Sequence, residues 1–83
     1  MLKVSVISPE AVLFEGETDS VVAPAYDGEI GILTGHAPLM ALLGEGQLRL
    51  GGGPGQRFNI SGGFMQVLNN DVRVVTEKAA AAS

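Results

Sequence analysis

The sequence predicts an all-β fold: an antiparallel β-sandwich of about ten short strands with no substantial helix. Apolar and polar residues alternate with a period of two along most of its 83 residues, and no window shows helical periodicity. Turn signals rich in glycine, proline and asparagine separate the alternating segments at near-regular spacing. Several segments carry apolar residues on both faces near their turns, which favours a sandwich over a barrel.

The first half of the chain contains five predicted strands. In the opening strand Leu2, Val4 and Val6 share one face, and polar residues take the other. The third strand is expected to stop at Pro24, because proline has no N–H to donate to a central ladder. The five strands are predicted at residues 2–6, 12–17, 21–23, 28–33 and 39–43.

The second half of the chain contains further strands and an alanine-rich tail. Residues 51–55 are predicted to form a flexible turn, and Asn69-Asn70-Asp71 a hairpin turn. We expect residues 1–78 to form one domain. Residues 79–83 have a helix-forming composition, and we expect them to fray because about two helical turns are not stable alone in water. The strands are predicted at residues 47–50, 58–60, 64–68 and 72–74.

Composition and charge exclude several classes of function. The net charge is −4 and the five basic residues are dispersed, which argues against a nucleic-acid partner. The chain has no cysteine, no secretory signal and no apolar stretch near the ~20 residues that span a bilayer. We therefore expect a soluble, cytosolic chain without direct membrane insertion. Its mean hydropathy of +0.30 is high, so we expect another subunit to cover some of its apolar surface.

Catalysis has one candidate pair of residues. His36 is the only good candidate for a general base near neutral pH. Ser61 is the hydroxyl whose neighbouring residues are most similar to a nucleophile motif. Residues 59–63 lack the first glycine of a Gly-x-Ser-x-Gly nucleophile elbow, so we expect no catalytic residue. The chain also lacks a zinc ligand set, calcium-loop spacing and the lysine of a phosphate-binding loop. We therefore expect no metal and no cofactor.

The most informative segment is residues 28–39, which read Gly-Glu-Ile-Gly-Ile-Leu-Thr-Gly-His-Ala-Pro-Leu. Three glycines and a proline among apolar side chains indicate a shaped, rigid excursion between strands. Together with Ser-Gly-Gly-Phe at residues 61–64, this segment resembles the epsilon subunit of rotary F-type ATP synthases, and specifically its β-sandwich domain. The resemblance covers nearly the whole chain.

The resemblance implies a fold, a function and two sets of contact residues. It implies a ten-stranded sandwich in the central stalk, a non-catalytic rotor subunit that couples ion flow through the c-ring to ATP synthesis. Its partners would be the gamma subunit and the polar loops of the c-ring. Its place would be peripheral, on the cytoplasmic face of the bacterial inner membrane, within the F1 sector. The implied c-ring contacts are Gly28, Glu29, Ile30 and Gly31, and the implied gamma contacts are Ser8, His36 and Ala41.

Each of these contact residues also has a purely structural reading. Glu29 would pair with basic loop residues of the c-ring, or it is simply a solvated turn carboxylate. His36 would donate across the gamma interface, or its ring braces the turn that follows Gly35. Ser8 would pack closely against gamma, or its hydroxyl bonds its own turn. Ala41 would allow the same close packing, or it fills the core.

One departure from the family pattern and two other functions remain open. Family members continue into a helical hairpin with inhibitory and ATP-sensing roles, whereas this chain stops at Ser83. We expect a naturally short subunit that couples without self-inhibition. The main alternative is a free-standing β-sandwich that binds a small ligand such as a sugar. It requires a concave pocket lined by aromatic residues, of which the chain has Phe14, Tyr26, Phe58 and Phe64. A hydrolase would instead need His36 and Ser61 within hydrogen-bond reach.

Overall fold

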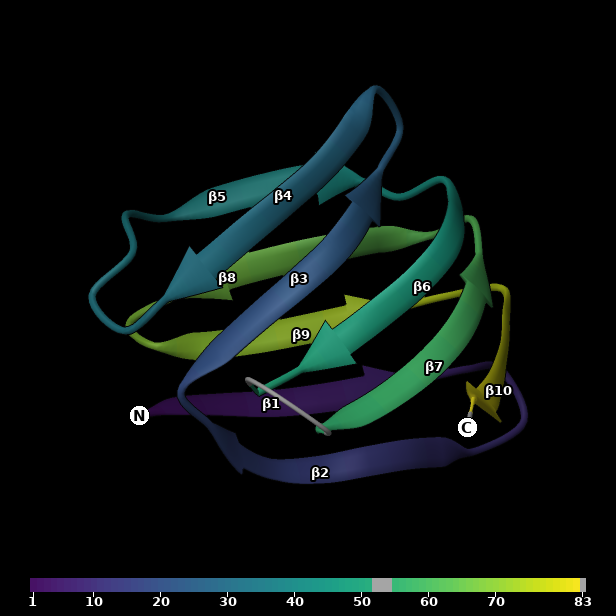
Figure 1. Ribbon diagram of the computed structural model, residues 1–83, viewed down its shortest axis with the longest axis horizontal. Helices are drawn as coiled ribbons and strands as arrows, with labels where there is room; N and C mark the ends of the chain where they lie inside the picture. Colours follow the sequence, from purple (N-terminus) through teal and green to yellow (C-terminus); the bar gives the residue numbers. More distant parts are fainter. Residues whose placement is uncertain (52–54, 83) are drawn as a thin grey trace.

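The computed structural model describes residues 1–51 and 55–82, which form ten strands in two packed sheets (Figure 1). The all-β sandwich predicted from the alternation is confirmed. No segment of the described residues is a helix of the length and apolar character that crossing a membrane requires. The strands are β1 (Leu2–Ile7), β2 (Val12–Thr18), β3 (Ser20–Ala25), β4 (Gly28–Leu33), β5 (Leu39–Leu42), β6 (Glu45–Leu50), β7 (Gln56–Ser61), β8 (Phe64–Leu68), β9 (Asp71–Val75) and β10 (Lys78–Ala82).

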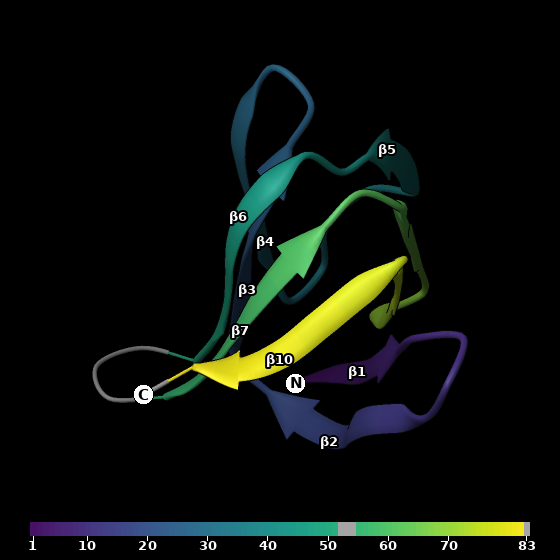
Figure 2. The ribbon, with the colours of Figure 1, turned by 90° about the vertical axis from the view of Figure 1, so that its right-hand side faces the viewer.

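Each sheet contains five strands. Sheet A has the order β2-β1-β9-β8-β5, and sheet B has the order β10-β7-β6-β3-β4. Sheet B lies in front of sheet A in Figure 1, and Figure 2 looks onto β10, the edge strand of sheet B. Among the described residues the strand pairings are antiparallel except for β1 with β9, which are parallel. No hairpin joins β1 to β9, so their relative direction is not constrained to be antiparallel.

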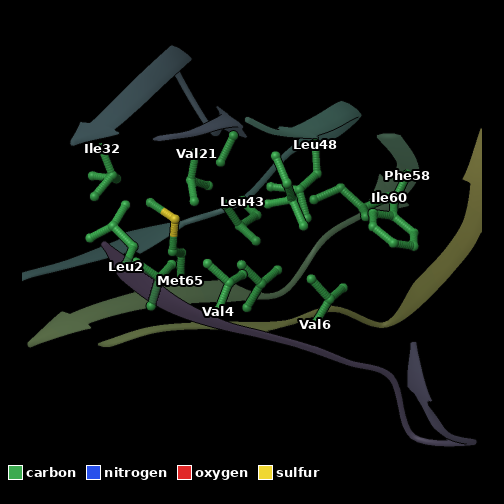
Figure 3. Packing of buried hydrophobic residues seen from close by; sticks show 14 of the residues in the cluster. Leu2, Val4, Val6, Val21, Ile32, Leu43, Leu48, Phe58, Ile60 and Met65 are labelled. Atoms are coloured by element: carbon green, nitrogen blue, oxygen red, sulfur yellow. The ribbon is translucent and has the colours of Figure 1, made fainter. Parts of the chain in front are cut away.

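The core lies between the two sheets and contains the side chains that alternate inward (Figure 3). Burying each of these side chains fully stabilises the fold by roughly 1.5–3 kcal/mol. An edge-to-face contact between Phe14 and Phe58, with ring centroids 6.3 Å apart, links β2 of one sheet to β7 of the other. The buried apolar residues are Leu2, Val4, Val6, Val21, Ala23, Ile32, Leu43, Leu48, Leu50, Phe58, Ile60, Met65, Val67, Val72 and Val74.

The third strand does not stop at Pro24, contrary to the expectation. β3 continues to Ala25, although it is a central strand of sheet B. Its pairing with β6 ends at Val22, so no acceptor on β6 requires an N–H from Pro24. The carbonyl of Pro24 instead accepts from Gly44 N at 2.8 Å. Gly46 makes room for the ring, since an added Cβ there would lie 2.8 Å from the Cβ of Pro24.

The alanine-rich tail is also different from the expectation that it frays. Residues 78–82 form β10, which pairs antiparallel with β7 at the edge of sheet B. Ala79 lies opposite Ile60 and packs against the core. Backbone hydrogen bonds to a preformed edge stabilise a segment that is too short for an isolated helix. Residue 83 and the centre of the expected glycine-rich turn, residues 52–54, lie outside the described residues.

Candidate functional site

Residues 28–39 occupy one side of the sandwich, where they join its two sheets. β4 is the edge strand of sheet B, β5 is the edge strand of sheet A, and the intervening loop crosses between them (Figure 1). In β4 the alternation turns Ile32 into the core and lets Ile30 pack against it. Glu29, Gly31 and Leu33 therefore take the outer face of sheet B.

Glu29 is held by an arginine of a strand that is not its neighbour. Nη2 of Arg49 on β6 donates to both carboxylate oxygens, at 3.1 Å to Oε1 and 3.0 Å to Oε2. Glu29 thus lies in a strand and is ion-paired, whereas its contact with the c-ring stays a prediction. The side chain of Arg49 is 41% exposed and that of Glu29 is 61% exposed, so the pair contributes only about 0–1 kcal/mol to stability. Its main effect is to fix where the carboxylate lies.

The surface around this ion pair carries a second cation and borders a hollow of about 290 Å³ that Val22, Arg49 and Arg57 help to line. Val22 of β3 lies between the two strands and is paired with both Gly31 and Arg49. A Cβ added at Gly31 would meet no atom within 4 Å, so the surface above it is open. Arg57 of β7 stands directly opposite Arg49. We call these five residues, Glu29, Gly31, Val22, Arg49 and Arg57, the charged strip.

The loop after β4 is tied to the turn between β8 and β9. Gly35 N donates to Oδ1 of Asn70 at 2.7 Å. Asn69 and Asn70 have φ values of 51° and 61°, which confirms the hairpin turn predicted there. His36 braces the loop: its backbone N donates to the carbonyl of Leu33 at 3.1 Å, and ring Nδ1 lies 2.7 Å from the carbonyl oxygen of Ala37. These bonds are the ones that the structural reading of His36 expects, and its contact with gamma stays a prediction.

The three residues implied as gamma contacts do not form one cluster. Ser8 follows the end of β1, and its hydroxyl bonds its own turn at Ala11. His36 lies at the other end of β1, because Lys3 N and Gly35 N both donate to Asn70. Six strand residues separate these ends by about 20 Å. Ala41 pairs with buried Met65 on the core side of β5.

Sequence reasoning missed an apolar row that crosses the outer face of sheet A. Strand pairing places one residue from each of its five strands side by side in this row. The two end residues are strongly exposed, Leu42 by 69% and Val12 by 57%. The alternation gave a partial signal, because several strands carry apolar residues on both faces near their turns. We call this set the apolar row: Val12, Ile7, Val75, Phe64 and Leu42.

The Ser-Gly-Gly motif has a structural explanation in the turn between β7 and β8. The buried hydroxyl oxygen of Thr76 lies 2.9 Å from the carbonyl oxygens of Gly62 and Lys78, and its single proton can be donated to either of them. A Cβ added at Gly63 would overlap the carbonyl oxygen of Val75, and its φ is 106°. The motif therefore allows the turn to pack against Val75 at the end of β9 and against Thr76 after it. Ser61 contributes its carbonyl to this cluster, whereas His36 bonds within its own loop.

The surface hollows give the ligand-binding alternative no support. One hollow, of about 500 Å³, is lined by charged and polar residues together with Met1 and Leu68. Neither it nor the two smaller hollows found with it is lined by an aromatic residue. Within residues 1–51 and 55–82, no group of three or more His, Asp or Glu side chains is placed to hold a metal ion.

Comparison with known proteins gives one family over the length of the chain. A family model described as "ATP synthase, Delta/Epsilon chain, beta-sandwich domain" matches residues 1–82. The ATP synthase epsilon chain of Leptospira interrogans is 44% identical over 80 residues, which cover 95% of this chain and 63% of that relative. The epsilon chain of Syntrophomonas wolfei is 46% identical over 76 residues, or 89% of this chain and 56% of that relative. The chain thus spans about 63% or less of the length of these relatives.

Two solved assemblies contain a chain of the same fold. One is the Euglena gracilis mitochondrial ATP synthase, described as OSCP/F1/c-ring, with a TM-score of 0.88 and 25% identity over 96% of this chain and 52% of that chain. The other is the central stalk and c-ring of the Tetrahymena thermophila mitochondrial ATP synthase, with a TM-score of 0.78. It covers 95% of this chain and 65% of that chain, and at 17% identity it supports the fold alone.

Proposed function

This chain belongs to the delta/epsilon-chain β-sandwich family of ATP synthases, and from that premise we propose that it is a non-catalytic subunit of the rotor stalk. In this role it joins the gamma subunit to the c-ring and couples ion translocation to ATP synthesis elsewhere in the complex. Its location is then peripheral, on the cytoplasmic face of the inner membrane, within the F1 sector.

The observation that carries this proposal is the contrast between the two outer faces. Sheet A presents the apolar row, and sheet B presents the charged strip. A rotor joint has to transmit torque between two different bodies, so it needs two separate contact surfaces on one stiff element. The paired strands supply the stiffness, because bending either sheet strains many hydrogen bonds together.

We assign the gamma subunit to the apolar row. Burial of exposed apolar side chains is the dominant favourable term in most protein association, and Leu42 and Val12 are more than half exposed in the free chain. Ser8 directly follows Ile7 of this row in the sequence, at the end of β1. His36 and Ala41, implied as gamma contacts by family resemblance, lie outside the row and remain proposals of lower structural support.

We assign the c-ring to the charged strip and to the segment of β4 that forms its edge, which comprises Gly28, Glu29, Ile30 and Gly31. Glu29 is fixed by Arg49 yet exposed, which suits a carboxylate that meets a polar loop. The open surface above Gly31 lets a loop backbone approach the sheet. Ile30 anchors the strand from the core side.

The test is co-purification of the chain with its cognate gamma subunit, repeated in the presence of the c-ring. A stable 1:1 complex with gamma that also retains the c-ring supports the proposed function. A monodisperse chain that ignores both partners contradicts it, and the small-ligand alternative then becomes the leading hypothesis.

A further inference from the structure

The charges of this protein are divided unevenly between its surfaces. The outer face of sheet B carries three cations and two carboxylates, a net charge of +1, whereas the chain as a whole carries −4. The remaining surface therefore carries −5. A docking face of opposite sign to the rest of the protein favours a partner that presents negative charge there. The five residues are Glu29, Glu45, Arg49, Arg57 and Lys78.

Within this face two cations, Arg57 and Lys78, form no ion pair in the part of the chain that the structure describes, and Arg57 is the one that belongs to the charged strip. Arg49 and Arg57 are directly opposite across β6 and β7, where Cβ atoms lie about 5 Å apart. Both carboxylate oxygens of Glu29 accept from Arg49. Glu29 therefore offsets the charge of Arg49 but not that of Arg57. Arg57 is exposed, and no ion pair reaches it among residues 1–51 and 55–82. The charged strip is thus negative at β4 and positive at β7.

We infer that Arg57 binds a carboxylate of the polar c-ring loop, while Glu29 meets a basic group of the same loop. This inference rests on the proposed function, since it takes the c-ring as the occupant of the charged strip. A guanidinium offers two parallel N–H donors that match a carboxylate in geometry as well as charge. The two contacts together give the loop a direction on the sheet, with its basic side over β4 and its acidic side over β7.

The spacing of the strip sets what the loop has to supply. β4, β3, β6 and β7 are successive neighbours in sheet B, and Arg57 is in register with Gly31, two residues along β4 from Glu29. Three strand spacings and two residues along the strand separate Glu29 from Arg57 by about 16 Å. At the β4 side of that span, the short side chain of Val22 and the absent one of Gly31 leave room for the loop backbone. A loop of a few residues, with long side chains at both ends, can bridge this distance.

The fold does not need the positive charge of Arg57, which lies opposite that of Arg49. A like-charged pair directly opposite in a sheet destabilises the free protein. Arg57→Gln removes this repulsion, so we expect an unchanged or higher melting temperature together with weaker docking. Opposite signs of the two effects separate a role in recognition from a role in folding.

The experiment measures the dissociation constant of the chain, in its complex with gamma, from detergent-purified c-ring. We expect Arg57→Gln to raise it about tenfold and Arg57→Glu to raise it further. The matched control is Arg73→Glu, an exposed arginine on the outer face of sheet A but outside the apolar row. Its complex with gamma is first verified by co-purification, and its dissociation constant from the c-ring is then expected to equal that of wild type. Each carboxylate of the cognate c-ring loop is then changed to lysine in turn, and one such change is expected to restore binding of Arg57→Glu.

Three other results would contradict the inference. Wild-type affinity in Arg57→Glu would remove Arg57 from the interface and leave the proposed function intact. Weakened binding that no loop reversal restores would mean that Arg57 acts through something other than a loop carboxylate. Failure of the wild-type complex to bind the c-ring at all would overturn the proposed function, and this inference with it.

Discussion

Arg49 on β6 reaches across β3 to bind Glu29 on β4, with Nη2 at 3.0 and 3.1 Å from the two carboxylate oxygens. The two residues are 20 positions apart in the sequence and lie on strands that do not pair with each other. The contact fixes the position of an exposed carboxylate on the outer face of sheet B. The contact joins the negative charge of the edge strand β4 to the positive charge of β6, an inner strand of sheet B.

Reversing the charge of Glu29 tests the c-ring assignment. We expect Glu29→Lys to weaken retention on the c-ring, because it removes the negative end of the charged strip. The unfolding free energy should fall by only about 1 kcal/mol, since the lost pair is exposed. Urea denaturation and a c-ring retention assay measure the two effects. Glu17→Lys, the same change on the outer face of sheet A, is the control. Unchanged retention in Glu29→Lys would remove Glu29 from the site.

Two glycines that look alike in the sequence should respond differently to alanine. Gly63→Ala places a Cβ against the carbonyl of Val75 at a φ of 106°, so we expect a loss of about 2–4 kcal/mol or failure to fold. Gly31→Ala enters open space, and we expect a change within about 0.5 kcal/mol. Chemical denaturation measures both. Equal stabilities would mean that the turn at Gly63 relaxes in a way the structure does not show.

The apolar row can be tested without disturbing the core. We expect Leu42→Asp to raise the dissociation constant for gamma about tenfold or more, since a charge would be buried in the interface. Leu33→Asp makes the same change at a residue 64% exposed on the outer face of sheet B, and we expect no effect on gamma binding. Both variants should keep wild-type melting temperatures. Equal effects of the two changes would show that gamma does not recognise the apolar row.

The hydrogen bond between Asn70 and Gly35 should control the mobility of the loop that carries His36. Asn70→Gly keeps a residue that tolerates the φ of 61° and removes the side-chain acceptor. We expect amide hydrogen exchange at Gly35 to accelerate about tenfold, with a stability loss of about 1 kcal/mol. Asn69→Gly in the same turn is the control. Identical exchange in both variants would show that the turn, rather than this bond, orders the loop.

Most of the fold could be predicted because alternation reports which face of each strand is buried. Leu2, Val4 and Val6 are all buried, as their spacing indicates. The two errors have physical causes. Pro24 is tolerated because the regular pairing of β3 with β6 ends at Val22, and no local sequence pattern encodes where that pairing ends. The alanines of β10 have no alternation to read, so only the free edge of β7 determines that they form a strand.

The candidate site could be predicted only where it is local in sequence. The segment from Gly28 to Leu33 was located from its glycines, and Ile30 and Ile32 face inward as expected. The partner of Glu29 could not be found, because it requires knowing that β6 lies beside β3. The apolar row combines single residues from five strands, so no window of the sequence contains it.

The central claim is that the two outer faces bind two different partners, and site-directed cross-linking tests it most directly. The chain has no cysteine, so Leu42→Cys and Gly31→Cys each introduce a unique attachment point for a photoreactive maleimide. In the assembled complex, the account predicts that the Leu42→Cys variant cross-links to gamma and the Gly31→Cys variant to the c-ring subunit. Cross-links from both positions to the same subunit, or to the opposite partners, would contradict it.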